Sequence, residues 1–194
     1  MRVFGHEGIE RALRGGYPAL AILERYCGVE WQTLEPERAR PLEGSSLVVE
    51  PFEVGGDAPR YLSGSGVELQ ANGFLFRDGA TGGVATYVPG LARLDDAVLT
   101  RFAMSDLVLV DGTFWRDDEL ARLGISARSA RDMGHVPLSG PSGTLEALAR
   151  LDGPRKVLVH INNTNPILLE DSPERQAVHR AGVEVAYDGL EIAL

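Results

Sequence analysis

Three side chains that can bind a metal follow apolar segments or lie in a glycine-flanked loop. Asp111 comes directly after the apolar run 107–110, and His160 comes directly after Val157-Leu158-Val159. His135 lies in a loop with a glycine before it and a proline shortly after it. Open α/β sheets carry their sites at the carboxyl ends of strands. Because two imidazoles and a carboxylate suit a borderline ion such as zinc or iron, these three residues are the candidate metal ligands.

Each of these residues also has an ordinary structural explanation. An Asp before a Gly usually forms a turn, and a single His in a loop is usually solvated. The shared placement of Asp111 and His160 at strand ends favours a common site. We therefore expect the side-chain ends of Asp111, His135 and His160 to converge on one pocket.

The segment that begins at His160 is rich in side-chain amides. It reads His-Ile-Asn-Asn-Thr-Asn-Pro, so that Asn162, Asn163 and Asn165 follow a buried strand within a few residues. These amides are candidate active-site groups, and they can equally form Asx turns that shape the loop. Both roles are compatible, and we expect Asn163 and Asn165 to brace the loop that aims His160.

Other reactive side chains have simpler interpretations. His179 falls within an expected helix and is interpreted as a surface residue, and His6 has no acidic or histidine partner at ligand spacing. Cys27 has no neighbouring Cys or His and is expected to be a small buried apolar residue. The segment 140–143 resembles a phosphate loop but lacks the Gly-Lys-Ser/Thr ending.

Apolar patterns and turn residues predict alternating helices and strands. Helices are expected at 6–14, 18–26, 117–123, 144–151 and 173–181. Strands are expected at 47–54, 67–76, 83–88, 107–110, 156–159, 183–187 and 190–194, with an exposed loop at 55–66. The second and third strands form a plausible hairpin. This alternation predicts an α/β class, in a single domain over 1–194.

Composition narrows the function classes. The net charge of −9 disfavours binding to nucleic acid, where clustered Lys and Arg supply the affinity. No apolar run approaches the roughly 20 residues of a membrane span, and the first residues lack the apolar stretch of a secretory signal. One cysteine fits a reducing compartment, so a cytoplasmic protein without nucleic-acid or membrane partners is expected.

Several longer motifs resemble one family. They are 26–31 (YCGVEW), 87–90 (YVPG), 110–115 (VDGTFW), 133–137 (MGHVP), 160–166 (HINNTNP) and 185–189 (VAYDG). This set is similar to the pyrroloquinoline quinone (PQQ) biosynthesis protein B family of the metallo-β-lactamase superfamily. The resemblance implies an αββα sandwich with a metal site at one edge of the sheets. It also implies that His160 is the last metal-binding histidine, His135 an extra active-site histidine, and Asp111 a ligand or an orienting group.

The chain departs from that family at two places. Members normally carry a longer N-terminal part, with a Cys-rich zinc site and a loop that supplies the first metal ligands. The chain is therefore expected to be N-terminally shortened, without the opening strands and the first metal loop. The segment 87–90 also stands where the bridging aspartate of the superfamily is expected.

The resemblance implies iron-dependent hydroxylation of the tyrosine ring of a Glu-Tyr-derived PQQ precursor. A divalent metal, Fe²⁺ in preference to Zn²⁺, is the implied cofactor, and a homodimer or a partner supplying the missing N-terminal half is the implied assembly. Two alternatives stay open. One is a non-catalytic carrier of PQQ or its precursor, and the other is a phosphodiesterase of the same fold.

Few ligands and missing strands predict weak metal binding together with self-association. Asp111, His135 and His160 leave most coordination positions of an ion to water, and an uncovered sheet edge or face pairs with another chain. Metal content after stripping and reloading with Fe²⁺ or Zn²⁺, measured beside mass by light scattering, tests both expectations. Stoichiometric, chelator-resistant metal on a monomer would contradict them.

Overall fold

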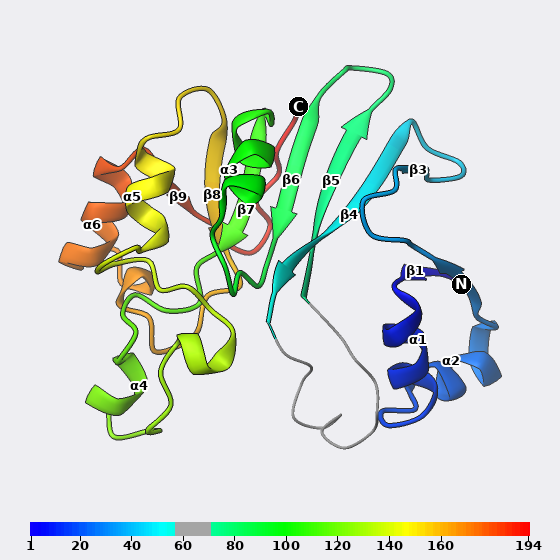
Figure 1. Cartoon of the computed structure of the whole chain (residues 1–194), viewed down its shortest axis with the longest axis horizontal. Coiled ribbons are helices and arrows are strands. Elements are labelled where there is room, and N and C mark those ends of the chain that lie inside the picture. Colours follow the sequence, from blue (N-terminus) through cyan, green and yellow to red (C-terminus); the bar gives the residue numbers. More distant parts are fainter. Residues whose placement is uncertain (57–70) are drawn as a thin grey trace.

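The computed structural model describes residues 1–56 and 71–194, and a seven-stranded mixed sheet forms the centre of this part (Figure 1). The strand order is β3-β4-β5-β6-β7-β8-β9, with antiparallel pairing from β3 to β6 and parallel pairing from β6 to β9. The strands are β3 (Arg40–Pro41), β4 (Leu47–Gly55), β5 (Ala71–Asp78), β6 (Val84–Val88), β7 (Leu107–Asp111), β8 (Arg155–Val159) and β9 (Glu184–Val185).

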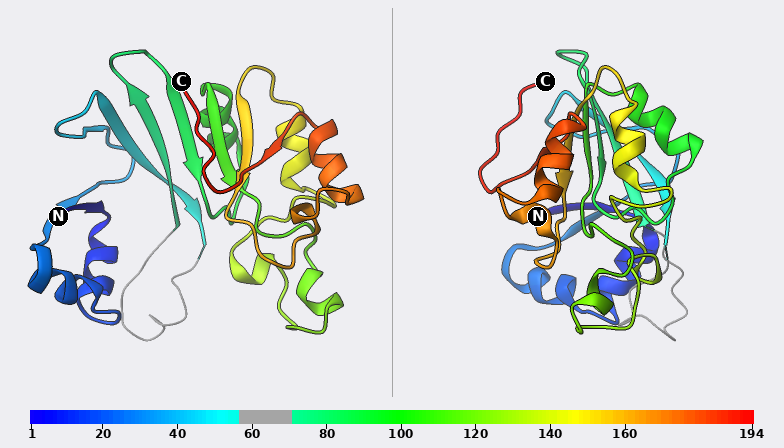
Figure 2. Two further views of the ribbon diagram at one scale, coloured as in Figure 1. Left: turned by 180° about the vertical axis from the view of Figure 1, so that it is seen from behind. Right: turned by 90° about the vertical axis from the view of Figure 1, so that its left-hand side faces the viewer.

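Three helices connect the four parallel strands in turn. They are α3 (Asp96–Ala103), α5 (Thr144–Ala149) and α6 (Pro173–Arg180). Right-handed crossovers that advance in one direction place their helices on the same face of a sheet. Figure 2 shows α3 and α5 on the same side of the strands. All three helices contribute to one buried cluster with the strands, through Val98, Phe102, Leu148, Val178, Leu75, Val88, Val108, Val110 and Leu158.

The opposite face of the sheet carries apolar side chains that are only half-buried. Phe74, Tyr87 and Leu109 lie in register across β5, β6 and β7. Phe76 shares this face, with its ring centroid 6.3 Å from that of Phe74. Because side chains alternate along a strand, this row points away from the cluster that contains Leu75. The described chain therefore has one helix-covered face and one apolar face that it covers only in part.

The N-terminal residues form a small unit of their own. Strands β1 (Arg2–Gly5) and β2 (Glu30–Thr33) pair in parallel, and α1 (Glu7–Arg14) and α2 (Ala19–Cys27) connect them. In Figure 1 this unit lies near β3 and β4, on the side of the sheet away from α5 and α6. The remaining short elements are α4 (Glu119–Arg122), η2 (Arg131–Met133) and η3 (Pro166–Leu168). No described helix has the length and apolar character needed to span a bilayer.

The α/β class and most predicted elements are confirmed. The two predicted strands that differ lie at the C-terminal end of the sequence. The segment 190–194 forms no strand, because its backbone joins no ladder and begins with a turn in which the Leu190 N–H donates to the Tyr187 carbonyl at 3.1 Å. Only two residues of the expected strand 183–187 pair, as β9. Cys27 was expected to be buried, but it is exposed. It is the last residue of α2, and the buried residue of this helix is Leu20.

Among the described residues, three strands and one α-helix were not predicted from the sequence, namely β1, β2, β3 and α3. The sequence does carry a signal for the start of α3, because Asp is a preferred N-cap residue. In the structure the Asp95 carboxylate accepts from the Val98 N–H at 3.0 Å. That hydrogen bond holds the pKa of Asp95 below its usual value. Most of the expected loop 55–66 and the start of the expected strand 67–76 lie outside the described residues.

Gly112, which follows β7, is expected to tolerate no side chain. A Cβ there would lie 3.0 Å from the Leu158 Cβ and 3.2 Å from the Val159 carbonyl oxygen of the neighbouring strand. Gly112→Ala should therefore lower the free energy of unfolding by about 1–3 kcal/mol. Urea denaturation measures this loss. Gly90→Ala is the matched control, because a Cβ at Gly90 meets nothing within 4 Å; equal stability of the two variants would contradict the prediction.

Candidate metal centre

Asp111 is the last residue of β7, and its carboxylate is buried, with a side chain that is 1% exposed. Oxygen Oδ1 accepts from the Thr113 backbone N–H at 2.9 Å and from the Thr113 hydroxyl at 2.5 Å. Oxygen Oδ2 accepts from the Leu91 N–H at 2.9 Å and lies 2.6 Å from His135 Nδ1. Both oxygens are thus engaged by groups from three different segments, so the carboxylate anchors the site.

His135 reaches Asp111 from the loop after η2. Gly134 adopts the left-handed conformation (φ 82°) that ends η2, and the His135 N–H donates to the Ala130 carbonyl at 3.0 Å. Its ring packs edge-on against Phe114, with centroids 5.9 Å apart. A carboxylate oxygen can only accept, so Nδ1 of His135 carries the proton that it donates to Asp111. The lone pair of His135 is therefore on Nε2.

His160 follows β8 and turns its ring towards the same point. Its backbone has φ 54°, a left-handed conformation that is uncommon for residues other than Gly. The ring stacks on that of His135, with centroids 5.5 Å apart and planes 23° apart. The Thr113 hydroxyl lies 2.8 Å from Nδ1 and 2.9 Å from the carbonyl oxygen of His160. The His160 side chain is 54% exposed and accessible to a ligand.

The expected convergence of the three candidate ligands is present in the structure. One ligand atom from each of Asp111, His135 and His160 lies within 4.8 Å of the others. Because Asp111 already accepts four hydrogen bonds, metal ligation by its carboxylate would displace donors from a buried charge. The donor set therefore fits a divalent ion bound through the two imidazoles, with Asp111 orienting His135.

The loop after β8 is braced by two of its amides. Asn165 is buried; its Nδ2 donates to the Gly112 carbonyl at 2.8 Å, and its Oδ1 accepts from the Ile167 N–H at 3.1 Å. Asn162 Nδ2 donates to the Thr164 hydroxyl at 2.6 Å. Asn163 is exposed, and its side chain forms no hydrogen bond with other described residues. The expectation that Asn163 braces the loop is therefore wrong.

Two polar residues of the site, Thr113 and Glu119, were missed by sequence reasoning. Thr113 links Asp111 to His160, as described above. Glu119 is buried and accepts from the Trp115 N–H at 2.7 Å and from the Thr164 hydroxyl at 2.5 Å, which ties the segment after β7 to the segment after β8. A threonine two residues after a strand-end aspartate is a common turn signal, so the sequence did not distinguish it from an ordinary Asx turn.

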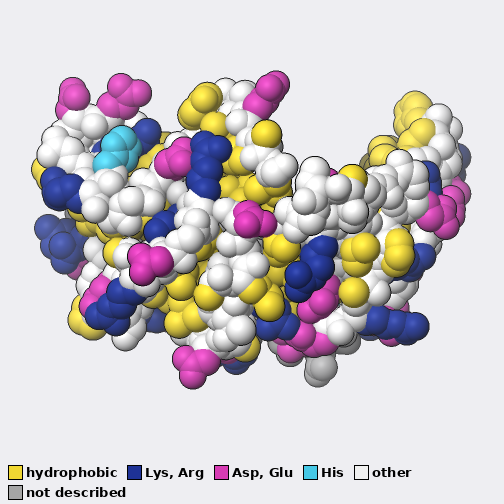
Figure 3. Space-filling view, turned by 90° about the horizontal axis from the view of Figure 1, so that it is seen from above, with side chains coloured by type: hydrophobic (Ala, Val, Ile, Leu, Met, Phe, Trp, Pro, Cys, Tyr) yellow, Lys and Arg dark blue, Asp and Glu magenta, His cyan; other side chains and the backbone are white. Residues whose placement is uncertain are grey.

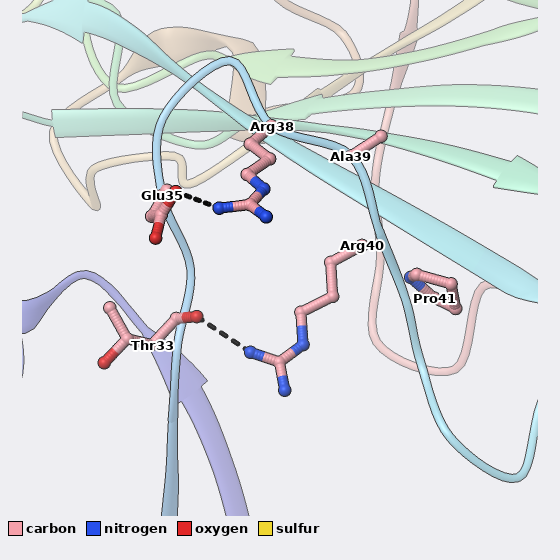
Figure 4. Close-up of a pocket in the computed structure, with 6 residues that line it drawn as sticks. All are labelled: Thr33, Glu35, Arg38, Ala39, Arg40 and Pro41. Atoms are coloured by element: carbon pink, nitrogen blue, oxygen red, sulfur yellow. Dashed lines mark hydrogen bonds and ion pairs between the residues drawn. The ribbon is translucent and has the colours of Figure 1, made fainter.

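The other candidate residues lie apart from this cluster. His6 caps α1 by accepting from the Gly8 N–H, and exposed His179 of α6 accepts from Arg175. A pocket of about 330 Å³ between β2 and β3 holds two arginines, but Arg38 pairs with Glu35 and Arg40 donates to the Thr33 carbonyl (Figure 4). None of the metal-binding candidates lines that pocket.

Comparison with known proteins connects this fold and cluster to one superfamily. A model of the beta-lactamase superfamily domain matches residues 1–161. Coenzyme PQQ synthesis protein B of Cupriavidus necator is 47% identical over 94% of this chain and 61% of the relative. The protein of that name from Methylococcus capsulatus is 42% identical over 100% of this chain and 65% of the relative.

Solved structures agree with these sequence relationships. Zn²⁺-bound PqqB from Methylobacterium extorquens superposes with a TM-score of 0.86 at 32% identity, covering 100% of this chain and 65% of that one. The short form of human tRNase Z gives a TM-score of 0.57 at 14% identity, which shows a shared fold alone.

The chain therefore belongs to the beta-lactamase superfamily and has the metallo-β-lactamase fold. Within that superfamily it is a homologue of coenzyme PQQ synthesis protein B. It spans about three fifths of the length of the curated relatives that it matches.

Substitutions of Asn163 and Asn165 are expected to differ in their effect on stability. Asn165→Ala leaves the Gly112 carbonyl and the Ile167 N–H without their partner, which should cost about 1–3 kcal/mol of unfolding free energy. Asn163→Ala removes no such bond, so its change should stay within about 0.5 kcal/mol. Thermal and urea denaturation of both variants measures the difference. A loss of the same size in Asn163→Ala would contradict the assigned roles.

Proposed function

We propose that this chain acts in PQQ biosynthesis and takes part in a metal-dependent hydroxylation of the tyrosine ring of a Glu-Tyr-derived precursor. The observation that carries the proposal is the convergence of His135 and His160 beside the buried carboxylate of Asp111. The relatives named coenzyme PQQ synthesis protein B support the pathway.

His135 and His160 would hold the metal, while Asp111 keeps the ring of His135 in place. Fe²⁺ is the proposed ion, because imidazole ligands with open coordination positions suit ferrous iron and oxygen chemistry. Zn²⁺ also suits imidazole ligands, and the PqqB structure from Methylobacterium extorquens is Zn²⁺-bound. A bound ferrous ion would supply the activation of O₂. Asn162 and exposed Asn163 lie on the same loop as His160 and are proposed to contact the precursor.

The proposed setting is the cytoplasm, with the chain either as a homodimer or beside a polypeptide that supplies further metal ligands. The half-buried row of Phe74, Phe76, Tyr87 and Leu109 supports association through the sheet face. Charged side chains of both signs are interspersed on the face seen in Figure 3, without a large basic area. The net charge of −9 favours a small precursor over nucleic acid as the ligand.

Hydroxylation requires O₂, two electrons and two protons, and yields one hydroxylated ring and one water. The test therefore supplies Fe²⁺, O₂, ascorbate and a Glu-Tyr-containing peptide to residues 1–194, alone and with the N-terminal part of the Cupriavidus necator relative. Mass spectrometry should detect the addition of one oxygen atom to the peptide. His160→Gln should abolish this product, and exposed His179→Gln is the matched control.

Each alternative has a distinct result in the same experiment. Precursor binding without conversion under every condition would indicate a carrier. Cleavage of a phosphodiester dye that depends on His160 would indicate a phosphodiesterase. Hydroxylation that persists in His160→Gln would contradict the proposed site.

A further inference from the structure

The Thr113 hydroxyl occupies a position where three polar atoms compete for one proton. It lies 2.5 Å from Asp111 Oδ1, 2.9 Å from the His160 carbonyl oxygen and 2.8 Å from His160 Nδ1. Thr113 is itself buried, at 7% exposure, so water does not readily replace any of these contacts. A hydroxyl has one hydrogen to donate and two lone pairs that accept.

Two of the three neighbours can only accept. The Asp111 carboxylate and the His160 carbonyl both require the hydroxyl hydrogen, and the shortest of the contacts is the one to Asp111. If the hydrogen pointed instead at His160 Nδ1, the hydroxyl oxygen would face the carboxylate oxygen at 2.5 Å with no proton between them. That arrangement is repulsive, so the hydroxyl donates to Asp111 and accepts from His160.

We propose that Thr113 is a positioning residue that holds His160 as its Nδ1–H tautomer and thereby presents the Nε2 lone pair of His160 beside that of His135. Asp111 determines the tautomer of His135 directly, and it determines that of His160 through the Thr113 hydroxyl. The tautomer of a ligating histidine is set by the hydrogen bond of its other nitrogen. One buried carboxylate therefore prepares both imidazoles to bind the same cation.

Thr113 contacts a residue with an uncommon backbone conformation. His160 has a positive φ, and the Thr113 hydroxyl lies within hydrogen-bond distance of both the backbone oxygen and the ring of this residue. Because the one hydroxyl hydrogen goes to Asp111, the carbonyl oxygen is a close neighbour and not an acceptor, and Thr113 acts on His160 through the ring. Thr113 would have this role at the site in each of the reactions considered above.

Long-range ¹⁵N–¹H NMR of the histidine side chains tests the tautomer directly. The spectrum is recorded in mildly alkaline buffer without metal, and the His160 signals are assigned by their loss in His160→Gln. Wild type and Thr113→Ser, which keeps the hydroxyl, should show His160 protonated on Nδ1. Thr113→Val, which keeps the shape but not the hydroxyl, should show a shift of His160 towards protonation on Nε2, while His6 and His179 stay unchanged.

Zn²⁺ titration of the same variants gives a second readout. Loss of the hydrogen-bond partner of a ligating histidine typically weakens metal binding by about 10–100-fold. The Zn²⁺ affinity of Thr113→Val should therefore be lower than that of the wild type by at least about 10-fold, and Thr113→Ser should recover most of this loss. Thr86→Val is the control for removing a buried threonine hydroxyl elsewhere, since Thr86 pairs with Ser105. Its Zn²⁺ affinity should equal that of the wild type.

Two results would overturn the proposal. One is a wild-type spectrum in which His160 is protonated on Nε2, and the other is a folded Thr113→Val with the wild-type tautomer and Zn²⁺ affinity. If Thr113→Val does not fold, the spectra of the wild type and of Thr113→Ser test the proposal, because both should show His160 protonated on Nδ1. Failure of the hydroxylation assay leaves these measurements unaffected, so the two ideas fail separately.

Discussion

A carboxylate removed from water must be matched by enough donors, and Asp111 imposes this constraint on the whole carboxyl edge of the sheet. Its burial would cost several kcal/mol if the charge were left unpaired. The donors come from the segments after β6 and β7 and from the loop after η2, through Leu91, Thr113 and His135. These segments are close to one another only when β6 and β7 are paired as they are. The pairing of β6 and β7 therefore also brings two of these donor segments to Asp111.

The conformation of His160 depends on that anchor. A left-handed conformation costs a residue with a side chain roughly 1–2 kcal/mol. Three hydrogen bonds around the turn offset this cost: the Gly112 N–H donates to the Val159 carbonyl, the Asn162 N–H to the Thr113 carbonyl, and the Asn165 amide to the Gly112 carbonyl. The residues after β7 thus hold the residues after β8, and Glu119 repeats this connection through Thr164.

The sequence was most informative where one apolar run ended in one polar residue. The runs before Asp111 and His160 predicted β7, β8 and the position of both side chains, because buried parallel strands show uninterrupted apolar residues. The short strands β1, β2 and β3 have no such run, and α3 was hidden between the expected strands although Asp95 marks its start. The distinction between Asn163 and Asn165 depends on which amide faces the Gly112 carbonyl, and three asparagines in one loop look alike in sequence.

The hydrogen bonds of Asp111 also decide how the three candidate ligands divide their roles. The oxygens of Asp111 accept from backbone, hydroxyl and imidazole donors. In the proposed site, Asp111 therefore contributes charge and orientation, and the two Nε2 atoms would be the ligands of the cation. Two neutral imidazoles leave most positions of a tetrahedral or octahedral ion to other ligands. Affinity from His135 and His160 alone would then be modest, but open positions are also what a metal needs in order to accept a substrate and an oxidant. In the proposed function, the low number of protein ligands would therefore both weaken metal binding and leave room for the reaction, once further ligands complete the coordination.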